Sequence, residues 1–383
     1  MKISEKVKYL GVNDHKIDLF EGQYVVPNGM SYNSYAIIDE KIAVFDSVDG
    51  RFSEEWIANI RAELKDKTPD YLIVQHMEPD HSGSISKFME CFPNAQIVSS
   101  QKAFVMMKNF YGDDYSNRQI VVKEGSQLEL GSHKLTFIEA PMVHWPEVIM
   151  SYEESEKILF SADAFGKFGA LDVDEEWACE ARRYYVGIVG KYGVQVQKVL
   201  QKAKNLDICT ICPLHGPILT ENLSYYLDLY NTWSAYLTES DGVTIAYTSV
   251  YGNTKKAVEI LAELLTEKGI KVAVNDLARC DMAEAVEDAF RYGKVVLATT
   301  TYNGQIFPFM REFISTLAEH NFQNKLVGFI ENGSWFSTAT KIMKDGLSKC
   351  AKLTFTEANV RILSAVNEAN VQEIKMLAEE LSK

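Results

Sequence analysis

The segment His76-Met77-Glu78-Pro79-Asp80-His81 places two imidazoles and two carboxylates within six residues. The mostly apolar run Tyr71–Gln75 before it predicts a short buried strand, and Ser82-Gly83-Ser84 after it opens a predicted helix. The four ionisable side chains therefore fall on a strand-to-helix loop, where they can converge. A bound divalent metal would offset their mutual repulsion and the cost of their desolvation. We favour a metal site over a solvated polar loop.

Three further potential ligands each follow a predicted strand: His144, Asp163 and His215. The preceding strands are expected at residues 134–139, 157–161 and 207–212. A single histidine or aspartate after a strand is common and usually carries no function. Four strand ends with the same ligand chemistry are harder to dismiss, because a sheet could deliver all of them to one edge. We therefore expect these residues to complete the site that begins at His76.

The length of 383 residues predicts two domains. The polar segment Thr238–Gly242 interrupts the pattern, and we place the boundary there, between a first domain of residues 1–240 and a second of residues 241–383. In the first, we expect a helix from Ser53, its N-cap, to Leu64, and further strands at residues 34–38, 42–46, 96–99, 120–123 and 148–152. In the second, strands are expected at 243–247, 270–274, 294–298 and 326–330, and helices at 254–268, 282–290, 309–317, from 338, and at 371–381. Strands and helices that alternate in this way predict an α/β domain with a doubly wound parallel sheet.

Charge and composition restrict the class of protein. The net charge is −14, with 53 acidic against 39 basic residues, which argues against non-specific binding of nucleic acid. No apolar run approaches the roughly 20 residues of a membrane span, and the N-terminus lacks the apolar core of a secretory signal, so we expect a cytoplasmic protein. Cys209 and Cys212 form a C-x-x-C pair on a predicted strand, where residues three apart point to opposite faces. We expect both to be buried structural cysteines, and a rubredoxin-type iron site would need a second such pair.

Three loops of the second domain follow its predicted strands, at the edge where a doubly wound sheet binds ligands. The first can hold a phosphate, because hydroxyls, a glycine and a helix N-terminus meet there. Tyr302 and Trp335 could stack on a flat ring, although each taken alone is better explained by ordinary packing. Together the loops predict a site for flavin mononucleotide (FMN). They are Thr248-Ser249-Val250-Tyr251-Gly252-Asn253-Thr254, Thr299-Thr300-Thr301-Tyr302-Asn303-Gly304 and Glu331-Asn332-Gly333-Ser334-Trp335.

These motifs resemble those of a known family. The first domain is similar to the metallo-β-lactamase fold, whose metal motif is H-x-H-x-D-H, but Glu78 stands where that motif has its second histidine. This substitution, with an appended flavodoxin-like domain, resembles the flavodiiron proteins, also called A-type flavoproteins. Three further segments match the family pattern: Tyr32–Tyr35, His144–Pro146 and Cys212–Gly216. The resemblance covers nearly the whole chain and implies an N-terminal αββα sandwich followed by a flavodoxin-like doubly wound sheet.

The resemblance also implies a set of iron ligands. One iron would be held by His76, Glu78 and His144, the other by Asp80, His81 and His215, and Asp163 would bridge them. Four nitrogens and three carboxylates form a harder set than a histidine-dominated zinc site, which suits redox-active iron. The family places a tyrosine near the irons, here either Tyr184 or Tyr185. Some members carry a histidine beside the iron ligands in the loop near Phe20, whereas residues 21–24 of this chain contain none.

The resemblance implies that the protein transfers electrons to a small gaseous substrate. The expected oxidoreductase reduces dioxygen to water, nitric oxide to nitrous oxide, or both, with electrons relayed through FMN from an external donor such as rubredoxin or another reduced carrier. The sequence leaves the preferred gas and the donor open. It also predicts a head-to-tail homodimer, or a tetramer of such dimers. Two alternatives remain: a dizinc hydrolase of the same fold, against which Glu78 argues, and a non-enzymatic flavin electron carrier, against which the complete ligand set argues.

Overall fold

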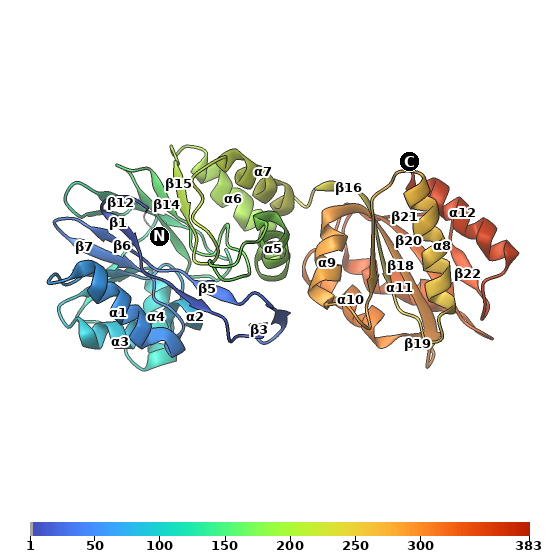
Figure 1. Cartoon of the computed structure of the whole chain (residues 1–383), viewed down its shortest axis with the longest axis horizontal. Helices are drawn as coiled ribbons and strands as arrows, with labels where there is room; N and C mark the ends of the chain where they lie inside the picture. The colour runs from blue at the N-terminus through green and yellow to red at the C-terminus, as the bar shows by residue number, and fades with distance from the viewer. Residues whose placement is uncertain (1–2) are drawn as a thin grey trace. The chain divides into compact units, whose positions relative to one another are not determined.

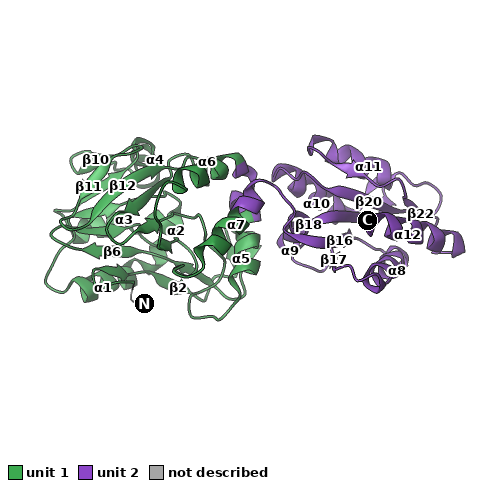
Figure 2. Cartoon of the chain, turned by 90° about the horizontal axis from the view of Figure 1, so that it is seen from above, with its two compact units in different colours: residues 1–185, 194–230 green, residues 186–193, 231–383 purple. Residues whose placement is uncertain are grey.

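The computed structural model describes residues 3–383. The chain divides into two compact units, coloured green and purple in Figure 2. Unit 1 comprises residues up to Tyr185 together with Val194–Tyr230, and unit 2 comprises Val186–Gly193 together with Asn231–Lys383. The expected boundary between residues 240 and 241 stays a prediction.

Unit 1 contains two main sheets. The first has the order β1 (Val7–Tyr9), β6 (Tyr35–Ile38), β7 (Ile42–Phe45), β8 (Tyr71–Ile73), β9 (Gln96–Ser99) and β10 (Gln119–Val121). The second has the order β11 (Gln127–Glu129), β12 (Lys134–Glu139), β13 (Ile149–Glu153), β14 (Ile158–Phe160) and β15 (Thr210–Cys212). One apolar core takes side chains from both, and the rings of Phe45 and Phe160 stack across it at 4.0 Å between centroids. The two sheets therefore form the expected sandwich.

Helices cover the outer sides of this sandwich (Figure 1). On one side lie α1 (Ser53–Leu64), α3 (Ile85–Cys91) and α4 (Gln101–Tyr111), and on the other lie α6 (Gly193–Ala203) and α7 (Leu223–Ser234). Helix α1 has the predicted bounds and buries Trp56, Ile57, Ile60 and Leu64. The prediction that Ser53 is its N-cap is wrong: Phe52 is the cap residue, and Ser53 Oγ donates to the carbonyl of Gly50 in the 3-10 turn before the helix.

Strand register brings the ends of both sheets to the same place. Phe45 of β7 pairs with Ile73 of β8, and Phe160 of β14 pairs with Cys212 of β15, each pair parallel. Because Phe45 stacks on Phe160, the residues that follow these strands emerge at one end of the sandwich. The small sheets β2 (Val12–Asp14) with β5 (Met30–Tyr32) and β3 (Leu19–Phe20) with β4 (Tyr24–Val25) were not predicted.

Unit 2 is a parallel sheet with the order β17 (Val272–Asp276), β16 (Ser240–Tyr247), β18 (Tyr292–Tyr302), β20 (Leu326–Asn332) and β21 (Thr354–Phe355), and β22 (Val360–Ile362) also pairs with β20. Helices α8 (Asn253–Glu267) and α12 (Glu368–Leu381) pack together on one face, and α9 (Met282–Arg291), α10 (Pro308–Glu319) and α11 (Ala339–Gly346) lie on the other (Figures 1 and 2). This is the predicted doubly wound sheet. Chain order reverses between β16 and β18, which is where such sheets bind ligands.

Two expectations about the surface meet the structure differently. Cys212 is buried, but Cys209 is exposed because β15 begins only at Thr210, so the prediction that both cysteines are buried is wrong for Cys209. Among residues 3–383, none of the helices combines the length and the apolar character that a membrane crossing needs. The cytoplasmic location stays a prediction.

Candidate metal centre

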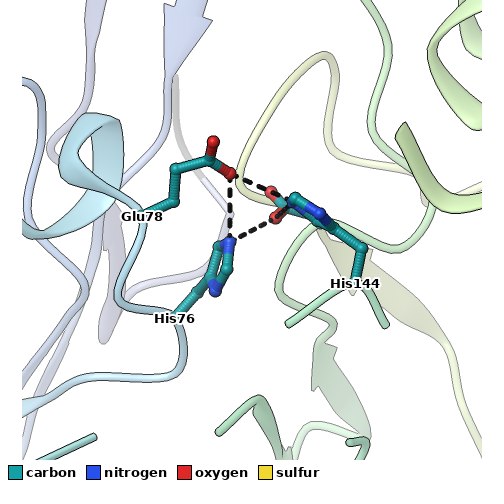
Figure 3. A group of neighbouring side chains, drawn as sticks. His76, Glu78 and His144 are labelled. Carbon is teal, nitrogen blue, oxygen red and sulfur yellow. Dashed lines mark hydrogen bonds and ion pairs between the residues drawn. The ribbon is translucent and has the colours of Figure 1, made fainter. Parts of the chain in front are cut away.

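Seven side chains from separate parts of unit 1 meet at one end of the sandwich. His76 and Glu78 lie on the loop after β8, and the short helix α2 (Pro79–Ser82) carries Asp80 and His81. The other three follow β12, β14 and β15: His144, Asp163 and His215. The structure therefore brings together every residue predicted to hold a metal. Figure 3 shows three of them, His76, Glu78 and His144, pointing toward one another.

The first set of donors, here called the His76 group, consists of His76, Glu78, His144 and one oxygen of Asp163. Glu78 Oε2 lies 3.3 Å from His76 Nε2 and 3.0 Å from His144 Nε2. Asp163 Oδ2 lies 3.1 Å and 3.3 Å from the same two nitrogens. These four side chains therefore direct one donor atom each at a common point.

The second set, here called the Asp80 group, consists of Asp80, His81, His215 and the other oxygen of Asp163. Asp80 Oδ2 lies 3.3 Å from His81 Nε2 and 3.2 Å from His215 Nε2. Asp163 Oδ1 lies 3.3 Å and 3.7 Å from these nitrogens. A single carboxylate thus gives one oxygen to each group, as a residue that bridges two cations would.

The separations fit a shell of ligands around an ion. Two atoms bound about 2.1 Å from one ion lie roughly 3.0 Å apart at a right angle and roughly 3.4 Å apart at the tetrahedral angle. Among residues 3–383, neither oxygen of Asp80 or Asp163 has a hydrogen-bond partner, although all four atoms are buried. Buried carboxylates without donors are costly. Cations at the centre of each group would satisfy them, so the residues present fit a pair of metal ions.

Burial and charge act in opposite directions on these groups. Burial alone would raise the pKa of Asp163, but the neighbouring His76, His144 and His81 outweigh it and hold that pKa well below the usual range. Burial alone would lower the pKa of His144, but the neighbouring carboxylates of Asp163 and Glu78 outweigh burial and raise it to about 9. The carboxylates thus stabilise positive charge at this point, and metal binding would release the protons that the imidazoles otherwise hold.

The backs of the metal-facing histidines are held by different partners. His76 Nδ1 lies 2.8 Å from Glu147 Oε1, and His215 Nδ1 lies 2.7 Å from the backbone carbonyl of Ser31. These contacts orient both rings with Nε2 toward the centre. The sequence prediction missed Glu147, although it directly follows the His144-Trp145-Pro146 segment.

The two tyrosines left open by the sequence take different places. The ring of Tyr184 packs edge-on against His215, 5.5 Å between centroids, whereas Tyr185 packs against Tyr230. Burial and the nearby carboxylates of Asp163, Glu78 and Asp80 raise the pKa of Tyr184 well above its usual value. Tyr184 is therefore the neutral hydroxyl of this pair nearest to the metal-facing side chains.

A second missed residue lies in the loop near Phe20, where no histidine is present. Burial of its carboxyl group and the nearby charge of Glu78 raise the pKa of Glu21 to about 7. Glu21 itself is exposed and has a positive φ of 49°, at the tight turn between β3 and β4. An acid is therefore present where sequence reasoning looked only for a histidine.

In unit 2 the three predicted loops line one cavity of about 470 Å³. Thr248, Gly252 and Thr299 are not among the residues that line it. Thr248 Oγ1 and Thr299 Oγ1 share a hydrogen bond of 2.6 Å, and Gly252 has a φ of 88° as the N-cap of α8. Ser249 Oγ accepts from the N–H groups of Gly252 and Lys255 at the helix N-terminus, where a phosphate is expected. Phe336 and Ser364, which were not predicted, line the cavity as well.

Two aromatic side chains at the mouth of this cavity are unusually exposed. Trp335 is 93% exposed and Tyr302 is 44% exposed. Exposed apolar side chains that gather in one patch often mark a binding site. Their placement at the rim supports the predicted stacking on a flat ring over packing in the core.

The chain is similar to known proteins along nearly its whole length. Residues 30–216 match the family described as ODP family beta lactamase, and residues 244–360 match the flavodoxin domain family. A nitric oxide reductase of Moorella thermoacetica is 32% identical over 362 residues, which cover 92% of this chain and 90% of that protein.

Solved structures agree. A rubredoxin oxygen:oxidoreductase from Desulfovibrio gigas superposes with a TM-score of 0.92 at 26% identity, covering 100% of this chain and 97% of that one. A variant of the flavodiiron protein from Thermotoga maritima gives a TM-score of 0.86 at 25% identity, covering 98% and 96%.

Proposed function

The chain belongs to the flavodiiron protein family of oxidoreductases, and we propose that it reduces dioxygen, nitric oxide or both at two iron ions held by unit 1, with electrons passed through FMN bound to unit 2. The observation that carries this proposal is the pair of donor groups that share Asp163, in which the oxygens of Asp80 and Asp163 have no hydrogen-bond partner. The names of the relatives support both gases, one being a nitric oxide reductase and another an oxygen oxidoreductase.

We assign one iron to the His76 group and the other to the Asp80 group, with Asp163 between them. Two ferrous ions and a two-electron reduced flavin together supply the four electrons that take dioxygen to water, whereas two suffice to take two nitric oxides to nitrous oxide. Within unit 1, Asp163 fixes the distance between the two groups, because each of its oxygens faces a different group.

Other side chains of unit 1 control water and protons at the centre. The rings of Phe20, Phe168 and Tyr184 pack against one another on the side of His215, and all three are buried. They exclude bulk water from that side. Glu21, at the exposed edge beside Glu78, is the acid placed to exchange protons with solvent.

In unit 2 we assign the phosphate of FMN to the loop from Thr248 to Thr254 and the ring to the loops Thr300–Gly304 and Asn332–Trp335. Backbone N–H groups at the start of α8 suit a phosphate. The exposed rings of Tyr302 and Trp335 offer flat apolar faces to the ring system. The name of the Desulfovibrio protein supports rubredoxin or another reduced carrier as the external electron donor.

The smallest active unit in this proposal is a head-to-tail homodimer, alone or as half of a tetramer. In such a dimer the two-fold axis brings the flavin of each chain to the irons of the other.

Two measurements separate this proposal from its alternatives. Metal analysis and an absorption spectrum of the purified protein should show two irons and one flavin per chain. Zinc without a yellow chromophore would instead indicate a dizinc hydrolase, and flavin without metal would indicate a simple electron carrier.

Anaerobic stopped-flow then tests the reaction itself. The fully reduced protein is mixed separately with dioxygen and with nitric oxide. At least one gas should reoxidise it as fast as one catalytic turnover, and the ratio of the two reoxidation rates gives the preferred gas. Slow reoxidation by both gases, with iron and flavin fully loaded, would overturn the proposed function.

A further inference from the structure

The two donor groups differ in what lies behind their histidines. In the His76 group, the Nδ1–H of His76 donates to a carboxylate, Glu147 Oε1, at 2.8 Å. In the Asp80 group, His215 donates to a neutral backbone carbonyl, and among residues 3–383 the buried Nδ1 of His81 has no hydrogen-bond partner. The charge that supports the two groups is therefore unequal.

Glu147 is held firmly in its place. Its side chain is fully buried, and Oε1 also accepts from the N–H of Met77 at 2.8 Å. Its backbone carbonyl accepts from Ser100 Oγ, the N-cap of α4. Within the described chain, its ion pair is with His76 alone, and Oε2 has no hydrogen-bond partner. The negative charge of this carboxylate thus acts mainly through His76.

Another carboxylate, Asp46, must be weighed in the same comparison. Asp46 is fully buried and close enough to His81 to feel its charge, but it makes no hydrogen bond to an imidazole. Its oxygens accept from the N–H groups of Gln75 and His76 and from the Gln75 side chain. Burial raises the pKa of Asp46 to about 6 despite these donors. It secures the loop that carries His76 and, unlike Glu147, does so without a hydrogen bond to an imidazole.

A carboxylate on Nδ1–H has three effects at a histidine ligand. It fixes the tautomer that leaves Nε2 free for the metal, and it makes that nitrogen more basic. The added negative charge also attracts a dication. A backbone carbonyl provides the first effect and little of the other two.

We propose that Glu147 is a positioning residue that makes the His76 group the tighter of the two metal subsites, so that this group fills first. The proposal rests on the dinuclear centre of the proposed function and adds an order of loading to it.

The substitution Glu147→Gln removes the negative charge of the carboxylate and keeps the size of the side chain, so it tests the effect of the charge alone. The glutamine oxygen can still accept from His76 and Met77, and its amide group takes the place of Oε2, which has no partner to lose. The matched control is Glu139→Gln. Glu139 lines the same surface pocket as Glu147 but is exposed and contacts no metal-facing side chain. A folded variant should retain its flavin and a cooperative thermal transition in the metal-free state.

The experiment is a titration of the metal-free, flavin-loaded full chain with Zn²⁺ in competition with a chromophoric chelator. The parent protein should bind two zinc ions in two resolved steps. Glu147→Gln should weaken the tighter step by about 10- to 100-fold and leave the affinity of the weaker step unchanged. The control Glu139→Gln should leave the affinities of both steps unchanged. Glu147→Asp keeps the charge and should retain more of the tighter step than Glu147→Gln, which keeps the test usable if glutamine disturbs folding.

A spectroscopic readout separates positioning from simple loss of packing. With ¹⁵N-labelled histidine, seven residues contribute signals, and in the zinc-loaded protein the Nδ1–H of His76 should show the shift of a strong charge-assisted hydrogen bond. Glu147→Gln should reduce that shift and Glu139→Gln should not.

The outcomes are distinguishable. Two zinc ions bound with affinities that do not respond to Glu147→Gln, or that fall equally in both steps, would overturn this inference alone. A parent protein that binds fewer than two zinc ions would overturn both the inference and the proposed dinuclear function.

Discussion

The Nε2 atoms of His81 and His215 lie 2.9 Å apart, although 134 residues separate the two histidines in the chain. Two buried imidazole nitrogens at this distance must share a proton or a cation, because their lone pairs would otherwise face each other. The carboxylates of Asp80 and Asp163 lie within 3.7 Å of the same atoms. Such a cluster makes the stability of unit 1 depend on what occupies it.

Removal of metal by a chelator should therefore destabilise unit 1. A ligand present at 1,000 times its Kd stabilises a folded protein by about 4 kcal/mol, and the metal-free protein loses this contribution. Scanning calorimetry of metal-loaded and chelated samples should show the transition of unit 1 at lower temperature. Flavin fluorescence should report unchanged binding in unit 2. Equal calorimetric midpoints with and without chelator would contradict the assignment.

The bridging role of Asp163 predicts a selective loss. Asp163→Asn keeps the shape of the side chain but removes the charge that both groups share, so iron content should fall well below two per chain and turnover should fall with it. Flavin content should stay normal. Asp172→Asn is the matched control, because Asp172 is an exposed residue paired with His15.

His81→Ala should act on one group only. Because the His76 group lacks His81, this variant should keep close to one iron per chain. Full iron and full turnover in either variant, measured by metal analysis and oxygen consumption, would show that these residues are not ligands.

A histidine outside the two donor groups, His133, predicts a pH dependence of stability. His133 is buried between Asp39 Oδ2 at 2.7 Å and Glu156 Oε1 at 3.1 Å, and Lys6 also contacts Asp39. Burial alone would lower the pKa of His133, but the two carboxylates outweigh it and raise the pKa. Because the pKa of His133 is higher in the folded state, its protonation stabilises the folded protein. This stabilisation is fully present below the unfolded-state pKa of about 6.5 and is lost as pH rises through the folded-state pKa.

Asp39 sets the lower limit of that pH window. The pKa of Asp39 is lowered by Lys6 and His133 against the effect of burial, so its contribution is present above the unfolded value of about 3.9 and is lost at lower pH. Between about pH 4 and 6.5, His133→Gln should therefore lower the thermal midpoint most, by about 2–4 °C for each kcal/mol lost. His15→Gln, at an exposed pair, should have no such profile. A difference that grew with rising pH would have the wrong sign.

The sequence predicted which seven side chains converge in unit 1, because their chemistry is concentrated in one short segment and repeated after strands. It could not identify Glu147, since its role depends on the loop before β13 folding back onto β8, where Ile149 N–H donates to Gln75. It could not choose between Tyr184 and Tyr185, because neighbouring residues of a helix point about 100° apart and only the packing of α5 (Trp177–Tyr184) decides which one meets His215. Short strands such as β2 and β5 were also missed, because their pairing with each other in the folded chain creates them and no local sequence pattern announces them.

The last prediction concerns the assembly that brings flavin and iron together. The two sites lie in different units, and the short connection between the units does not oblige the flavin and the irons of one chain to meet. In a head-to-tail dimer the two-fold axis places the flavin of each chain beside the irons of the other, so two such pairs form. Complementation between two defective chains tests the idea directly. One variant lacks flavin through changes at Ser249 and Thr254, which line the cavity of unit 2, and the other lacks iron through Asp163→Asn.

Mixed and allowed to exchange subunits, these chains should form hybrid dimers as half of the population. Each hybrid joins one intact flavin to one intact iron pair on the opposite chain, so about a quarter of the parent activity should return. Each variant incubated alone supplies the baseline, and two different affinity tags purified in sequence confirm that hybrids have formed. If electrons instead pass within one chain, no pairing of these variants places an intact flavin with intact irons, and hybrids isolated by both tags would have no more activity than the baseline.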